Sequence, residues 1–173
     1  FDLSNASTGH TYNVLGNASA ETAILIQAAQ NALDPADMAT LTVAGGTLRT
    51  VAASGTGRSI RVAYATTSNG TAGRLVVSGE HARVVADFIE LARGSQTGHL
   101  VIEDGARVVV KDLKPGLFGS STSDSRITVR DPGTTLQMER IYRHEHGRLV
   151  LVVENGAEIV GSTQWQLADD PLS

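Results

Sequence analysis

The sequence predicts an all-β chain folded as a parallel β-helix, and a repeated strand and turn unit is the first reason. A short apolar strand ending at a turn glycine recurs six times, with successive turn glycines 30, 33, 26, 28 and 23 residues apart. The six stretches are Tyr12–Gly16, Leu41–Gly46, Leu75–Gly79, Leu100–Gly105, Ile127–Gly133 and Leu149–Gly156. Such a repeat is typical of a solenoid, because one coil cannot bury its inner face alone and stacked coils bury a continuous apolar column.

Further short strands complete each unit and are the second reason. Second strands are expected at Ala82–Ala86, Ala106–Val110, Thr135–Met138 and Ala157–Val160, and third strands at Ile24–Ile26, Ile60–Tyr64, Phe88–Leu91 and Arg140–Tyr142. Apolar and polar residues alternate along most of these strands, which indicates one buried and one exposed face. We expect about six rungs, with an antiparallel β-sandwich as the alternative, because its strands also recur regularly.

The corners and the irregular first rungs follow from local chemistry. A glycine at each corner is expected to supply the positive φ that a sharp bend requires. Ala23–Gln27 fits a third strand, and Ala28–Leu33 fits a helical turn or a loop equally well. We divide a single β-helix segment into less regular first rungs (1–39), clear repeats (40–160) and a terminal rung or tail (161–173).

Composition limits the classes of function. The 173 residues suit one domain, and a net charge of −4 argues against nucleic acid as a partner. Cysteine is absent, which excludes thiol catalysis and Cys-ligated zinc and suits a bacterial protein that crosses the periplasm unfolded. The chain begins at Phe1 without a signal-like segment, so we interpret it as a fragment of a longer protein.

The repeats resemble those of the passenger domains of Gram-negative autotransporters. The resemblance is carried by Val77–Val85 followed by Phe88–Val108, and again by Ile127–Leu136 followed by Gly147–Ile159. It implies a right-handed β-helix displayed at the bacterial cell surface or secreted, with the full-length parent anchored by an outer-membrane β-barrel.

The same resemblance implies a non-catalytic function in adhesion, cell–cell aggregation or biofilm formation. The expected partners are a host-cell surface or its glycans, or neighbouring passengers through self-association. Two alternatives stay open: a structural stalk for an enzyme domain elsewhere in the parent, and a carbohydrate-active β-helix.

Two surface features are the candidate binding sites. A corner glycine directly precedes each of three basic residues, Arg74, His99 and Arg148, which would form a basic ladder if their rungs are in register. A polar-acidic ladder would form at the other end of the same strands, from Glu103-Asp104 and Glu154-Asn155. Such ladders suit multivalent contact, or merely keep a long sheet soluble. A longer loop from Lys111 to Ser125 is the other candidate. Its candidate residues are Lys111, Lys114, Leu117 and Phe118.

No catalytic, metal or cofactor site is predicted. The carboxylates fall mostly at turns or at outward positions of strands, where solvated side chains are usual. His144 and His146 would share one face of a strand, but Glu145, the nearest further ligand type, would point the other way.

Overall fold

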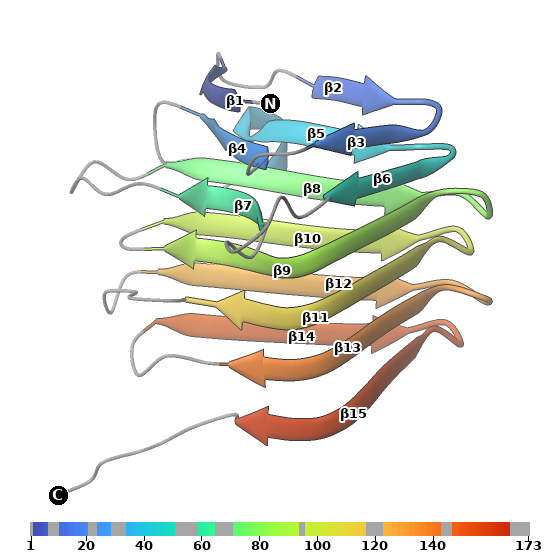
Figure 1. Ribbon diagram of the computed structural model, residues 1–173. Coiled ribbons are helices and arrows are strands. Elements are labelled where there is room, and N and C mark those ends of the chain that lie inside the picture. The colour runs from blue at the N-terminus through green and yellow to red at the C-terminus, as the bar shows by residue number, and fades with distance from the viewer. Residues whose placement is uncertain are drawn as a thin grey trace, which may run out of the picture.

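The chain forms a parallel β-helix made of two facing sheets (Figure 1). The computed structural model describes residues 2–6, 11–20, 24–28, 34–50, 59–64, 71–93, 96–116, 123–142 and 147–166. Most of these residues lie in β-strands, and every strand pair is parallel. The parallel pairing confirms the predicted solenoid and excludes the antiparallel sandwich.

One sheet is nearly flat and takes one strand from each coil. Its six strands, in spatial order, are β14 (Arg148–Glu154), β12 (Asp124–Arg130), β10 (Thr97–Glu103), β8 (Ala72–Ser78), β5 (Ala39–Val43) and β2 (Thr11–Val14). All six predicted first strands are therefore confirmed.

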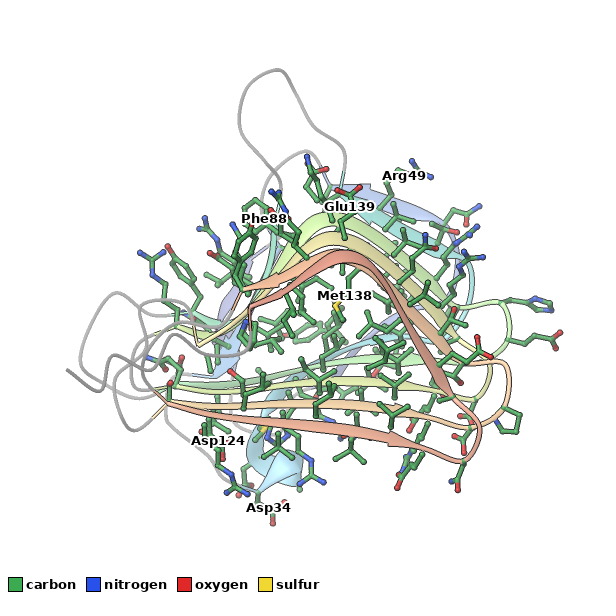
Figure 2. The ribbon with its side chains drawn as sticks, turned by 90° about the horizontal axis from the view of Figure 1, so that it is seen from below. Asp34, Arg49, Phe88, Asp124, Met138 and Glu139 are labelled. Atoms are coloured by element: carbon green, nitrogen blue, oxygen red, sulfur yellow. The ribbon has the colours of Figure 1, made fainter. Side chains whose placement is uncertain are left out.

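The second sheet is bent. Its early strands are β1 (Asp2–Ala6), β3 (Ala18–Ala20), β4 (Ile24–Ala28), β6 (Thr47–Thr50) and β7 (Ser59–Tyr64), and its later ones are β9 (Arg83–Arg93), β11 (Arg107–Pro115), β13 (Thr135–Tyr142) and β15 (Glu158–Gln166). In β9 and β13 the predicted second and third strands join into one continuous strand, and β11 and β15 extend beyond the predicted second strands. Figure 2 shows this sheet as an arch, with Glu139 outside its crest and Met138 pointing into the interior.

The regular solenoid consists of four turns, β8–β9, β10–β11, β12–β13 and β14–β15, which is fewer than the rungs expected, about six in all. In the two coils before them the bent strand is divided into β3 and β4, and into β6 and β7. Arg49 is the register partner of Val85, and Ser59 is that of Phe88. β6 and β7 therefore pair with β9 on either side of the crest, where β9 has only two residues between these positions.

The coil is right-handed. Seen from the C-terminal end, the strands of the flat sheet run from left to right along the bottom of the view, and those of the bent sheet return along the top (Figures 1 and 2). The chain approaches the viewer as it turns in this counterclockwise sense.

The space between the sheets is filled by columns of aliphatic side chains. Leu41, Leu75, Leu100 and Ile127 are successive register partners in the flat sheet and are at most 1% exposed. Ile60, Ile89, Leu113 and Ile141 form the facing column in the bent sheet. Each coil buries its inner face only against its neighbours, as the period-2 alternation predicts.

The glycines serve two different physical needs. The turn glycine Gly105 has a φ of 80°, as expected for a corner, whereas Gly16 does not have a positive φ. Gly98 lies within β10, near its start, and a Cβ there would lie 2.7 Å from the backbone nitrogen of Ala92 and 3.0 Å from the oxygen of Val62. Gly98 is therefore required for close approach of two backbone segments, a role that the sequence prediction did not distinguish from a corner.

The predicted loop at Lys111–Ser125 is shorter than expected. β11 continues to Pro115, because Lys114 and Pro115 still pair with Glu90 and Leu91, and β12 begins at Asp124. Lys111 and Lys114 are thus strand residues, and the apolar tip, Leu117 and Phe118, lies outside the described residues.

The first rungs contain the only described helical turn. The predicted strand at Ala23–Gln27 is confirmed by β4, whereas residues 29–33 of the possible helical turn lie outside the described residues. A short 3₁₀ helix, η1 (Pro35–Asp37), follows, and Figure 2 shows Asp34 beyond the outer face of the flat sheet. No helix in the described part of the chain is long and apolar enough to span a membrane.

Candidate functional site

The outer face of the flat sheet carries a column of basic side chains that we call the cationic column: Arg74, His99 and Arg126. Arg74 on β8 and Arg126 on β12 are the two register partners of His99 on β10. Neighbouring strands lie about 4.8 Å apart, so the three positions follow one another directly along the axis of the solenoid.

Arg148 does not belong to this column, and the expectation that it would is wrong. It pairs with Asp124, whereas Arg126 pairs with Val150. Glycine, a basic residue and leucine follow one another at the start of β8, β10 and β14, which suggested that these starts are aligned. The strands are instead aligned at their other end, where Arg130 pairs with Glu154. Gly147 lies nine positions before its turn glycine, Gly156, whereas Gly98 lies seven before Gly105, so Arg148 falls two positions before the column. Arg126 escaped the sequence analysis because it follows Ser125 rather than a glycine.

A shallow groove of about 190 Å³ lies along the cationic column. Its other lining residues come from the same three regular turns and from β14: Val101, Thr128, Arg130 and Glu154. The Nε atom of Arg74 is buried and has no hydrogen-bond partner. Burial lowers the pKa of His99 below its ordinary value, the charges of Arg126 and Arg74 lower it further, and Asp124 acts in the opposite direction. The cationic column therefore supplies hydrogen-bond donors to the groove, and burial favours the neutral form of His99.

The polar-acidic ladder at the other end of these strands is an alternating one. Arg130 lies between Glu103 and Glu154, because it follows Val129, which pairs with Ile102, and itself pairs with Glu154. The Nε of Arg130 donates a hydrogen bond of 2.8 Å to Glu103, and this bond raises the pKa of Arg130. The expected acidic stripe is thus interrupted and largely neutralised.

A second concave region follows the crest of the bent sheet. Its groove, about 290 Å³, includes Asp87 on β9, Lys111 on β11 and Glu139 on β13. The three residues occupy equivalent places, since the positions on both sides of them are register partners. Asp87 and Glu139 both have interaction partners. The candidate residue Lys111 therefore lies in a crest groove between two carboxylates and not in a loop.

Beyond the crest, the outer face pairs cations with aromatic rings and carboxylates. The ammonium of Lys114 lies 4.3 Å from the ring centre of Phe88. Arg140 binds both oxygens of Asp112, at 2.7 and 3.0 Å. On this face the described cations, including the candidate residue Lys114, are thus matched with partners, in contrast to those of the cationic column.

The remaining candidates can be placed only in part. His144 and His146 lie outside the described residues. Among the described residues, no three His, Asp or Glu side chains come together in a way that would hold a metal ion.

The chain was compared with protein-family models, with curated proteins and with solved structures, and none of them matches it.

Proposed function

We propose that this chain is a segment of a surface-displayed passenger of the autotransporter type, and that it acts non-catalytically in adhesion or cell–cell aggregation. The right-handed parallel solenoid and the recurrence of its repeat units support this proposal. The proposed partners are anionic groups on a host-cell surface or on a neighbouring bacterium. In the full-length parent an outer-membrane β-barrel would anchor the passenger.

The cationic column is the observation that carries the proposal. It presents Arg74, His99 and Arg126 on three consecutive strands of a rigid sheet, along an open groove rather than in an enclosed cavity. Side chains fixed at regular intervals along a rod suit many weak contacts with an extended polymer, because linked contacts raise the overall affinity without any single tight site.

An attachment assay tests this function. Beads coated with the chain are applied to host cells and to bacteria, and attachment and clumping are counted. The test variant carries Arg74→Gln, His99→Gln and Arg126→Gln. The matched control carries His81→Gln, Arg83→Gln and Arg107→Gln, the same substitutions at exposed positions outside the flat sheet.

The proposal predicts that the original chain and the control attach, and that the test variant does not. If the test variant attaches as well as the original chain, the binding surface lies outside the cationic column. If none of the folded chains attaches, the adhesive function is excluded and the structural stalk is the better explanation.

The crest groove favours a second candidate, a carbohydrate-active β-helix. Asp87 and Glu139 flank Lys111 two strands apart, about 10 Å at the backbone, a separation from which the carboxylates of an inverting glycosidase could act. Incubation with acidic and neutral polysaccharides, followed by measurement of reducing ends, tests this candidate. Activity lost in Asp87→Asn but kept in Glu80→Gln would support it.

A further inference from the structure

The two arginines of the cationic column, Arg74 and Arg126, differ from three other arginines of the described chain, each of which has a carboxylate partner. Arg61, Arg130 and Arg140 each form an ion pair with a carboxylate, at Glu90, Glu103 and Asp112 respectively. Within the described part of the chain, neither Arg74 nor Arg126 forms such a pair. Arg74 is partly buried, so it loses solvation without gaining a counter-charge in return, whereas Arg126 is exposed.

We propose that this groove is a binding site for a tetrahedral oxyanion group, a sulfate or phosphate ester, held between Arg74, His99 and Arg126. An arginine donates two parallel N–H bonds to such an oxyanion, and these charge-assisted bonds are about twice as strong as neutral ones. The buried Nε of Arg74, which has no partner, points to a missing acceptor. Thr128 and Val101 form the floor next to the column.

Carboxylates limit where the anion can sit. Glu154 lines the groove from β14, and Asp124 acts on His99 from β12. Arg148 is the register partner of Asp124, and Arg130 lies between Glu103 and Glu154. Each of these acidic groups thus has a basic neighbour, whereas the middle of the column, at His99, has basic neighbours on both strands. The anion is therefore placed over His99.

Binding at this place is coupled to proton uptake by His99. In the free chain, burial and the two arginines hold the pKa of His99 below its ordinary value. An oxyanion over the ring cancels the field of the arginines and accepts a hydrogen bond from the protonated form, so it raises that pKa. By linkage, the affinity for the anion increases as the pH falls through the range in which His99 titrates.

This inference names the ligand class for the surface on which the proposed function rests. Its test needs only the isolated chain in solution, so the site and the adhesive function can fail separately. A chain that binds anions but attaches to no cell would retain the site and lose the adhesive function.

The experiment is an NMR titration of the isolated chain with inorganic sulfate and with inorganic phosphate. Chloride at matched ionic strength serves as the reference, and the titrations are run at about pH 5.5 and about pH 7.5, on either side of the usual histidine pKa. We expect both oxyanions to shift the ring signals of His99. Sulfate, whose charge is constant over this pH range, is expected to bind several-fold more tightly at the lower pH, whereas phosphate itself takes up a proton in this range. Arg126→Gln is expected to weaken binding about tenfold, while Arg107→Gln leaves it unchanged.

His99→Gln should remove the pH dependence of sulfate binding, and His81→Gln should keep it. Arg126 and His81 are exposed, so these variants are expected to fold. Retention of the chain on sulfated-polysaccharide beads and on phosphate-bearing vesicles then identifies the source of the group, and retention on either one supports the site. The proposal is overturned if sulfate and phosphate cause no more change at His99 than chloride, or if Arg126→Gln binds as well as the original chain.

Discussion

At the scale of single residues, the fold depends on positions where only glycine leaves enough space. Gly98 is such a position, because the backbones of β7 and β9 approach it within 3.0 Å of where a Cβ would be. Gly16 has the opposite environment, since no atom lies within 4 Å of the place that a Cβ would take and its φ is not positive. Packing therefore requires a glycine at position 98 but not at position 16.

Gly98→Ala is expected to destabilise the chain by about 1–3 kcal/mol, the usual cost of forcing an extra carbon into a packed interior. The free energy of unfolding, measured by urea denaturation, gives the result. Gly16→Ala is the control and should change stability by less than about 0.5 kcal/mol. Equal effects of the two substitutions would contradict the role given to Gly98.

His99 makes stability depend on pH in a defined direction. Its pKa is lower in the folded chain than in the unfolded one, so below about pH 6.5 the unfolded chain binds more protons and stability falls as the pH falls. The loss ends below the pKa of the folded state. Urea denaturation across this range should show a decrease for the original chain that is smaller in His99→Gln. Identical pH profiles for the two chains would exclude a lowered pKa.

At the scale of strands, register decides which side chains meet. Inward residues form one aliphatic column from Leu41 to Ile127, and a slip by one residue would turn all of them outward. A slip by two would keep aliphatic residues in the inner column, although with new neighbours, and would give every outward side chain a new neighbour. The site on the outer face therefore depends on the register much more sensitively than the core does.

Cysteine pairs test this register, and the chain contains no cysteine of its own. His99→Cys with Arg126→Cys places two thiols on neighbouring strands about 5 Å apart at the backbone, and His99→Cys with Arg148→Cys places them about 12 Å apart. A short thiol-specific crosslinker should join the first pair rapidly and the second slowly. Faster crosslinking of the second pair would show that Arg148, and not Arg126, lies next to His99 in the cationic column.

The sequence allowed the strands to be predicted better than their alignment. Alternation and the turn glycines were sufficient to place all six strands of the flat sheet, because each feature is local. Arg148 was misplaced because the motif at the start of β14 resembles that of β10, while the register follows the turn at Asn155. Counting backward from the turns aligns Glu154, Arg130 and Glu103, and would have indicated Arg126 instead of Arg148. The pairing of cations with Phe88 and Asp112 could not be predicted, because it depends on how the bent strand passes over the crest.

At the scale of the whole molecule, stability is unevenly distributed along the axis. Leu100 is fully buried between coils, whereas Leu151, the equivalent residue in β14, is only partly buried because one neighbouring strand covers it. In a solenoid each coil is stabilised by its neighbours, so the middle coils gain from two interfaces and β14 and β15 from one.

Leu100→Ala should therefore cost about 2–5 kcal/mol, and Leu151→Ala distinctly less. Hydrogen exchange should show the same order, with the amides of β14 exchanging before those of β10. Equal costs at the two positions would indicate that a further layer covers β14 in solution.

The stacking of coils also determines how the chain responds to tension. Backbone hydrogen bonds between coils point along the axis, so a pull on the two ends loads the outermost coil first and peels it away. The starts of β8, β10, β12 and β14 are 25, 27 and 24 residues apart. Each detached coil releases about 80–95 Å of chain, at about 3.3–3.6 Å per residue. A chain built in this way lengthens in nearly even steps under tension. The remaining coils, and the groove on them, stay folded until the force reaches them.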